Sequence, residues 1–320
     1  MTSRPEISVI VPVRNAWDDA RGLLAALDAQ LGAPTFEVLL IDDHSSEPRP
    51  VDLGLAAGSL RIATPGGFGA YAARNHATTL ARGDVLAFTD ADCRPVPGWL
   101  AAGHAALADA AVVAGDVRIT LPDRPSLWAA LDAATFLDQR AAVRAGGAVT
   151  ANLFVRAESV REAGGFHDAD LPSGGDRDLV RRIGGRLVFS AEAQVQHPPR
   201  GTRQAFLSKL HATAVSSGRL AARRGGMPRA TRARAWVPAV GRLRHRRAAG
   251  LPLAFHNGRP EVVATRPGPV RHVTGAVVAY GVAPYVVNAG VLRGYREERR
   301  ALRDGPPVLA PSYGASPAHR

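Results

Sequence analysis

The stretch ISVIVPVRN, residues 7–15, begins with an apolar run rich in β-branched residues and ends in polar ones. Such a run is typical of a strand that is buried on both faces of a parallel sheet. Similar runs follow at 36–43 (FEVLLIDD) and 83–92 (GDVLAFTDAD), with a weaker one at 59–64 (SLRIAT). These four segments predict the strands that decide the fold.

Apolar residues recur at helical spacing between these strands, in residues 20–30 and 69–81. Strands that alternate with helices at this pitch predict a doubly wound, mostly parallel α/β sheet. In such sheets, ligands bind at the carboxyl ends of the strands. Polar side chains gather at those ends: Asn15, Asp42, Asp43, Asp90 and Asp92.

The second part of the sheet-forming region is more helical. A short apolar piece at 111–119 lies between helices, and residues 150–166 contain a further apolar segment. A turn is expected before a helix from Asp176 to Ile183, followed by a strand up to residue 190. The segment 193–199 (AQVQHPP) then closes the sheet-forming region.

The composition is that of a folded intracellular protein. The 320 residues are 46% hydrophobic, which suffices for a sizeable core, and the single cysteine, Cys93, excludes an intramolecular disulfide. The apolar run near the N-terminus is too short for a signal peptide, so we expect it to be the first strand of a cytoplasmic protein.

The charge is distributed unevenly along the chain. Residues 1–200 carry 19 arginines, no lysine and 24 acidic residues, whereas residues 201–320 carry 20 arginines, one lysine (Lys209) and four acidic residues. Such a basic region favours a polyanionic partner, for example an anionic membrane surface. The alternative is a solvated arginine-rich surface. No nucleic-acid-binding motif is present, and aromatic residues are only 6%, so we expect no nucleic-acid partner.

The basic region predicts helices. Residues 203–226 have the pattern of an amphipathic helix, and residues 273–292 are uncharged over a length that can cross a bilayer. Polar residues and Pro284 favour a buried or interfacial helix over a membrane span. We therefore predict an α/β domain at 1–200, a basic helical region at 201–304 that associates with membranes, and a disordered tail at 305–320.

Asp90 and Asp92 give the strongest local signal. They lie at i and i+2 where a buried strand ends, in FTDADCRP, and two carboxylates in this position suit a hard divalent cation that binds a diphosphate. The alternative is a pair of turn caps before Pro95. Asp42 and Asp43 follow the second strand, where they suit hydrogen bonds to a base or ribose.

Three further residues invite both chemical and structural interpretations. Asp176 suits a general base, but its position also fits a helix N-cap, and Asp178 fits a first-turn helix charge. His197, before two prolines, fits a metal ligand, a phosphate contact or an ordinary turn histidine. Cys93 is expected to be structural.

The loop GGFGAYAARN, from residue 66 to residue 75, has glycines spaced like those of a dinucleotide-binding fingerprint. That fingerprint requires the loop to follow the first strand, whereas this loop follows the third. A dinucleotide-dependent oxidoreductase is therefore disfavoured.

Taken together, the motifs resemble the family 2 glycosyltransferases of GT-A fold. The resemblance covers about residues 5–200, and its motifs occur in order at plausible spacings. It implies transfer of a sugar from a nucleotide-diphosphate donor to an acceptor hydroxyl, with inversion at the anomeric carbon and with Mg²⁺ or Mn²⁺. The matching segments are ISVIVPVRN, VLLIDDHSS, GGFGAYAARN, VLAFTDADCRP, TANLFVRAESVREAGGF, GGDRDLVRRI and VQHP.

The resemblance also implies residue roles. Asp176 matches the general base, although Gly175 stands where the family often has Glu, and Asp178 remains a rival. His44 replaces a small residue after the acidic pair, and Pro65 begins the run that replaces an Asn often found before the A-R-N helix. The resemblance implies that Asp92 binds the metal, and His197 is the second candidate ligand. It places Gly164, Gly165 and Phe166 on the acceptor side. The residues implied to bind the donor nucleotide are Pro12, Asn15, Asp42, Asp43, Arg74, Asn75 and Asp90.

Two readings of the whole chain follow. The first is an active glycosyltransferase that lies at the inner face of the cell membrane and uses a hydroxyl acceptor, such as a lipid-linked one. The second is a non-catalytic GT-A-like protein that binds nucleotide sugars or membrane surfaces. Retention of all three acidic sites favours the first.

Overall fold

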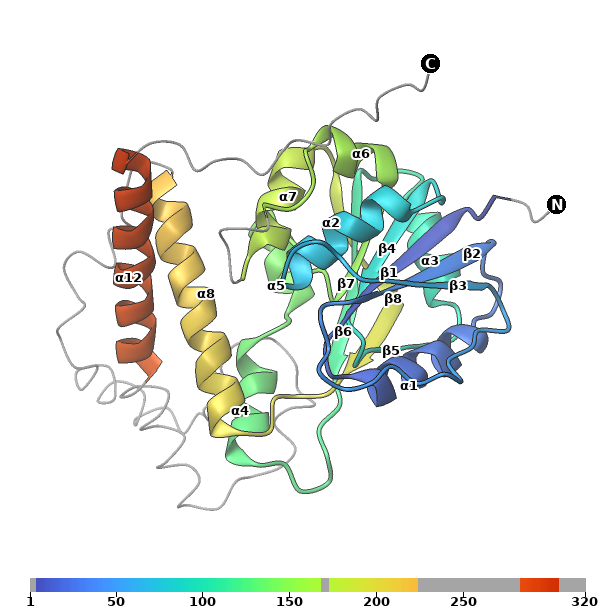
Figure 1. The fold of residues 1–320 in the computed structure, drawn as a ribbon, viewed down its shortest axis with the longest axis horizontal. Helices are drawn as coiled ribbons and strands as arrows, with labels where there is room; N and C mark the ends of the chain where they lie inside the picture. The colour runs from blue at the N-terminus through green and yellow to red at the C-terminus, as the bar shows by residue number, and fades with distance from the viewer. Residues whose placement is uncertain (1–3, 168–172, 224–282, 305–320) are drawn as a thin grey trace.

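The computed structural model describes residues 4–167, 173–223 and 283–304. Their centre is an eight-stranded sheet in the order β3-β2-β1-β4-β7-β6-β8-β5, with helices on both faces (Figure 1). The strands are β1 (Ile7–Val13), β2 (Phe36–Asp42), β3 (Ser59–Ala63), β4 (Val85–Thr89), β5 (Arg94–Pro95), β6 (Val112–Ile119), β7 (Asn152–Arg156) and β8 (Leu187–His197).

The helices fall into a group around the sheet and a C-terminal pair. The helices predicted at 20–30, 69–81 and 176–183 correspond to α1, α2 and α7, which begin at Trp17, Ala70 and Gly175. The group around the sheet is α1 (Trp17–Asp28), α2 (Ala70–Leu80), α3 (Trp99–Ala106), α4 (Leu127–Thr135), α5 (Gln139–Arg144), α6 (Ala157–Glu162) and α7 (Gly175–Ile183), and the pair is α8 (Arg203–Arg223) and α12 (Ala283–Asp304).

The N-terminal half of the sheet is parallel. Strand β1 pairs in parallel with β2 and β4, so that Ile7 lies opposite both Phe36 and Val85, and β3 extends this parallel unit. Beyond β4 the sheet is mixed, because β7 runs antiparallel to both β4 and β6 while β6 and β8 are parallel. The predicted α/β class with a mostly parallel, GT-A-like sheet and C-terminal helices is confirmed.

Each face of the sheet carries its own hydrophobic core. On one face, Val9 and Val11 pack with Leu23 of α1 and Trp99 of α3. On the other face, Ile10 packs with residues from α2, α6 and α7. Successive strand residues point to opposite faces, so a strand covered by helices on both sides must be apolar throughout. This explains why β1 is apolar except at Ser8, whose buried hydroxyl donates to Glu37 of β2.

The second half of the chain differs from the prediction in one strand. Residues 187–190 and 193–197 were expected as separate pieces, but β8 is continuous from Leu187 to His197. Its pairing with β6 shifts register between Gly115 and Asp116, and the side chain of Asn152 bridges this irregularity by donating to the carbonyls of Asp116 (2.8 Å) and Ala193 (2.7 Å). The apparent break in the sequence pattern is therefore a β-bulge.

Helices α8 and α12 lie side by side (Figure 1). At their contact, a Cβ on Gly218 would collide with the carbonyl of Val291, so glycine permits the close approach. Two ion pairs add to the contact, since Arg219 and Arg223 each bond a glutamate of α12 at 2.8 Å. The helix predicted from 203 is confirmed up to Arg223.

The predicted domain boundaries stay predictions. Residues 273–282 of the uncharged run and the tail at 305–320 lie outside the described residues, and residues 283–292 begin α12. Among the described helices, none combines the length and hydropathy needed to cross a bilayer.

Candidate active site

Asp90 and Asp92 follow the end of β4, as the sequence predicted. Asp90 accepts a hydrogen bond from Arg74 of α2 at 2.7 Å, and the arginine side chain is only 5% exposed. The guanidinium also lies over the ring of Tyr71, 5.8 Å from its centre. A buried arginine with this carboxylate fixes the loop after β4 to helix α2.

Asp92 lies beside His197 at the end of β8. His197 Nε2 is 3.4 Å from Asp92 Oδ1, and the histidine is 4% exposed. Its Nδ1 faces the carbonyl of Pro198, which only accepts hydrogen bonds, so Nδ1 carries a proton. Burial raises the pKa of the Asp92 carboxyl and Asp90 adds to this, while His197 opposes it. Nε2 of His197 therefore faces the carboxyl group of Asp92, whose ionised form is disfavoured by burial.

This pair fits a divalent cation. An octahedral cation such as Mg²⁺ places neighbouring ligand atoms about 3 Å apart, close to the 3.4 Å between Asp92 and His197. A backbone carbonyl on the opposite nitrogen is the usual support of a ligating histidine. Among the described residues, these two and Cys93 are the group whose ligand atoms lie within 4.8 Å of one another.

Cys93 is unsuited to that cation. Its Sγ lies 3.6 Å from the carbonyl of Ala151, and burial raises the pKa of the thiol. Since the thiolate is the form that binds metals, the group stays protonated and packs in the core. This agrees with the structural role expected for Cys93.

The donor-side residues after β1 and β2 hold their loops together. Asn15 Oδ1 accepts from the backbone of Ser46 at 2.7 Å, and Asp42 Oδ1 accepts from the backbone of Ser45 at 2.9 Å. The buried Asp43 accepts from the backbone N–H of Gly69 at 2.8 Å, directly before α2. Pro12 lies in β1 opposite Ile41. Their contact with a nucleotide stays a prediction.

Asn75 connects the donor-side helix to the predicted acceptor-side turn. Its side chain both donates to the carbonyl and accepts from the N–H of Phe166, each at 2.7 Å. Gly165, with a φ of +69°, approaches so closely that a Cβ there would lie 2.6 Å from Asn75 Oδ1. Gly164 precedes it in the same left-handed region. The turn GGF therefore depends on glycine for both conformation and space.

Asp176 lies in the first turn of α7. The N-cap alternative is wrong, because Gly174 caps this helix and Asp176 is its second residue. The carboxylate is buried, and it accepts from the N–H groups of Thr150 at 3.3 Å and Arg177 at 2.9 Å. Both of these partners are backbone donors, which leave lone pairs of the carboxylate for a further proton.

Asp178, the rival base, is engaged elsewhere. It accepts from Arg182 at 3.0 Å and lies 3.2 Å from His167. Arg182 also donates to the carbonyls of Ala163 and Gly165, so this pair ties α7 to the turn after α6. The structure gives Asp178 the helix-charge role that the sequence offered as its alternative.

Sequence reasoning missed several residues around Asp176. Tyr71 of α2 accepts from the N–H of Gly175 at 2.9 Å, and burial together with the Asp176 charge raises the pKa of its hydroxyl. Lys209, a residue of α8, reaches the segment before α7, where its Nζ lies 3.3 Å from Ser173 Oγ. No local pattern marks Tyr71, but Lys209 stands out as the one lysine in the chain.

The sequence is similar to those of known glycosyltransferases. A model of the family "Glycosyl transferase family 2" matches residues 8–157. The chain is 32% identical over 212 residues to "Glycosyltransferase AglE" of Haloferax volcanii, a match that covers 62% of this chain and 69% of that protein. It is 30% identical over 235 residues to a "Pre-mycofactocin glycosyltransferase" of Mycobacterium tuberculosis, covering 69% of this chain and 48% of that protein.

A solved structure shares the fold. The mannosyltransferase PcManGT from Pyrobaculum calidifontis, in complex with GDP-Man and Mn²⁺, matches with a TM-score of 0.54 at 19% identity, covering 93% of this chain and 88% of that one. The chain spans about half the length of the Mycobacterium relative.

Proposed function

Because the chain belongs to glycosyl transferase family 2 and is a glycosyltransferase, we propose that it transfers a sugar from a nucleoside-diphosphate donor to a hydroxyl, with inversion at the anomeric carbon. The family resemblance predicted from the sequence is thereby confirmed. The family model ends at residue 157, before Asp176 and His197, so the roles of these two residues rest on their own geometry.

One observation carries the proposal: helix α2 bonds to both parts of the site. Arg74 donates to Asp90 on the side of the D-x-D motif, and one turn earlier Tyr71 accepts from the first residue of α7, next to Asp176. A reaction that needs a diphosphate clamp and a base requires both to be held at a fixed separation. A single rigid helix between them supplies this.

Asp176 is the proposed general base. Its carboxylate takes the proton from the acceptor hydroxyl as the hydroxyl oxygen forms a bond to the anomeric carbon. On the opposite face of the sugar, the bond from that carbon to the phosphate oxygen breaks, and the electron pair leaves with the nucleoside diphosphate. One base and one displacement give inversion.

Asp92 and His197 would hold Mg²⁺ or Mn²⁺, as argued from their 3.4 Å separation. When bound, such a cation neutralises charge that develops on the leaving diphosphate. Asp90, which is bonded to Arg74 at 2.7 Å, would contact the donor nucleotide. The structural relative that carries GDP-Man and Mn²⁺ supports the use of both kinds of ligand.

The test is a donor screen. Wild-type protein with Mn²⁺ is offered UDP- and GDP-sugars, nucleotide release is measured, and the anomeric configuration of any glycoside is read by NMR. Asp176→Asn should lose transfer by about a hundredfold or more while still binding nucleotide. Asp178→Asn, on the same helix, serves as the matched control and should retain transfer per folded molecule.

Two results would count against parts of this assignment. Equal transfer by Asp176→Asn and wild type would exclude Asp176 as the base. Nucleotide binding without turnover of any donor and acceptor would favour the alternative, a non-catalytic GT-A-like binding protein.

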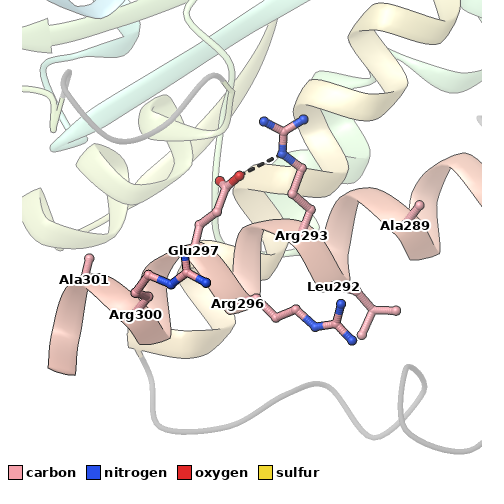
Figure 2. Close-up of a pocket in the computed structure, with 7 residues that line it drawn as sticks. All are labelled: Ala289, Leu292, Arg293, Arg296, Glu297, Arg300 and Ala301. Atoms are coloured by element: carbon pink, nitrogen blue, oxygen red, sulfur yellow. Dashed lines mark hydrogen bonds and ion pairs between the residues drawn. The ribbon is translucent and has the colours of Figure 1, made fainter. Parts of the chain in front are cut away.

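We also propose that the C-terminal region contacts an anionic membrane surface at the inner, cytoplasmic face of the cell membrane, where a lipid-linked acceptor would lie. The support is a groove on α12 whose lining includes three arginines (Figure 2). Arg293 in this groove bonds Glu297 at 2.7 Å, whereas Arg296 and Arg300 are exposed. The lining is Ala289, Leu292, Arg293, Arg296, Glu297, Arg300 and Ala301.

Vesicle flotation tests this second proposal. Full-length protein should float with vesicles that contain anionic lipid and remain behind with neutral ones. Changing Arg296, Arg299 and Arg300 together to Ser should weaken this binding, while Arg21→Ser, on the exposed part of α1, should not. Equal flotation of all variants would exclude the α12 surface as the contact.

A further inference from the structure

Lys209 is the one lysine in a chain that otherwise uses arginine. It is half-buried on α8, and its ammonium donates to the hydroxyl of Ser173 at 3.3 Å. Ser173 is buried directly before α7, three residues ahead of Asp176. A helix from the basic C-terminal region thus brings a cation to the proposed general base.

The face of α8 that carries Lys209 is fixed at both ends. Three residues before it, Phe206 packs against Trp128 of α4, with ring centres 5.8 Å apart. Four and seven residues after it, Thr213 lies 3.4 Å from the Ser173 hydroxyl, and Ser216 accepts from the Ser173 N–H at 2.9 Å. Residues at these spacings share one helix face. The ammonium is therefore held in place by packing.

Charged groups from several elements face this ammonium. Asp176 of α7 and Asp90 after β4 attract it, while Arg200 after β8 and Arg74 of α2 repel it. Most of these neighbouring charges are paired with one another or with a further group: Arg74 bonds Asp90 at 2.7 Å, and Arg200 bonds the buried Asp132 at 3.2 Å. Asp176 instead accepts from the backbone N–H groups of Thr150 and Arg177.

Among the described residues, the polar partner of Lys209 is the neutral hydroxyl of Ser173. Burial and the two arginines outweigh the carboxylates, so the pKa of Lys209 is lowered. A charge that is desolvated without a carboxylate partner costs free energy unless a ligand compensates it. The site is therefore built to receive an anion beside Asp176.

We propose that Lys209 binds the phosphate oxygens of the donor and of the nucleoside diphosphate that leaves. This assignment rests on the proposed function and adds a residue from beyond the segment that the family model matches. A lysine ammonium acts on phosphate as a compact point charge, whereas arginine requires a planar arrangement. The negative charge that develops on the leaving phosphate would thus meet a cation that is already in position.

The single lysine allows a direct test on the full-length wild-type chain. An amine-reactive acylating reagent has two primary amines to modify, Lys209 and the N-terminal α-amine, and mass spectrometry reports each separately. GDP and UDP, each with Mn²⁺, are added at concentrations that saturate binding in a parallel calorimetric titration. We expect acylation of Lys209 to slow by about tenfold or more, with no change at the N-terminal amine, which serves as the internal control.

Variants of Lys209 test the assignment independently of the acylation experiment. Lys209→Met should weaken nucleoside-diphosphate binding by about tenfold, and Lys209→Arg should restore part of it. Arg203→Met removes the same charge from an exposed position of α8 and should change nothing. Circular dichroism melts establish that each variant is folded, and we expect Lys209→Met to fold well because it removes a half-buried charge.

The outcomes separate this inference from the function on which it rests. If a nucleoside diphosphate binds the wild type but Lys209 is acylated at an unchanged rate, the Lys209 assignment is wrong and the proposed function stands. Full affinity in Lys209→Met would overturn it in the same way. If the wild type binds no nucleoside diphosphate, both proposals fail.

Discussion

Arg74 and Asp90 form an ion pair at 2.7 Å in which the arginine side chain is 5% exposed and the aspartate 34% exposed. The pair joins α2, whose sequence is AYAARNHATTL, to the loop that carries the D-x-D motif. Two motifs that are separate in the sequence are thus one structural unit.

Arg74→Lys should destabilise the protein by about 1–3 kcal/mol, because a shorter side chain with a different donor geometry leaves Asp90 and the buried arginine site poorly matched. Donor binding should weaken as well. Urea denaturation and nucleotide titration measure the two effects. Arg21→Lys is the control, since its pair with Asp52 has the same length of 2.7 Å but is exposed; an equal loss in both variants would contradict the prediction.

Removal of His197 should weaken metal binding. His197→Ala takes away one of the two proposed ligands, so Mn²⁺ affinity should fall by about tenfold or more. Electron paramagnetic resonance of free Mn²⁺ measures this without any turnover. His104→Ala on α3 should leave the affinity unchanged. Wild-type affinity in His197→Ala would show that the cation is held elsewhere.

Gly165→Ala should destabilise the turn that Asn75 holds. The substitution forces alanine to a φ of +69° and pushes its Cβ to 2.6 Å from Asn75 Oδ1. We expect the free energy of unfolding to fall by about 2–4 kcal/mol, because backbone strain in the left-handed region adds to the loss of two hydrogen bonds.

Gly164→Ala separates these two causes. Gly164 has a φ of +74°, but no atom lies within 4 Å of its added Cβ. It should therefore show the strain alone, about 1 kcal/mol. Thermal or urea melts of the two variants measure the difference, and identical losses would mean that the Asn75 contact contributes nothing.

The ionisation of Glu37 should make the stability of the protein depend on pH in the acidic range. It is fully buried in β2 and accepts from Ser8 Oγ at 2.8 Å and from the N–H of Arg82 at 2.7 Å. Although burial opposes it, the bonds from Arg82 and Ser8 hold the pKa of Glu37 below its ordinary value of 4.5. A lowered carboxyl pKa means that the unfolded state binds the proton more readily.

The stabilisation from Glu37 is therefore complete above pH 4.5 and is lost as the pH falls through the lower, folded-state value. Glu37→Gln should lower the free energy of unfolding by about 2–4 kcal/mol at pH 7, because buried donors lose a charged acceptor. The difference in unfolding free energy between this variant and the wild type should become smaller below pH 4.5. Urea denaturation across pH measures this. Glu6→Gln, at an exposed site, is the control. If the difference in unfolding free energy between Glu37→Gln and the wild type did not change with pH, the assignment would be wrong.

The family and most of the fold follow from local sequence patterns. The apolar runs of β1, β2 and β4 predict strands covered on both faces, and the acids that follow such strands lie at one edge of a parallel sheet. This is why the sequence already marks Asp90 and Asp92 as candidate site residues. The residues at 187–197 were harder, because a β-bulge interrupts the alternation of β8 without ending the strand.

Which acidic residue is available and which is engaged depends on contacts that form only in the folded protein. Asp176 and Asp178 are two residues apart and look alike locally, yet Asp178 bonds Arg182, while Asp176 accepts from the backbone N–H groups of Thr150 and Arg177. Asn75 and Phe166 meet across 91 residues, and Tyr71 and Gly175 across 104. Local periodicity sets each element and its buried face, but contacts over such separations arise only when the two cores pack, and they place Lys209 beside the site.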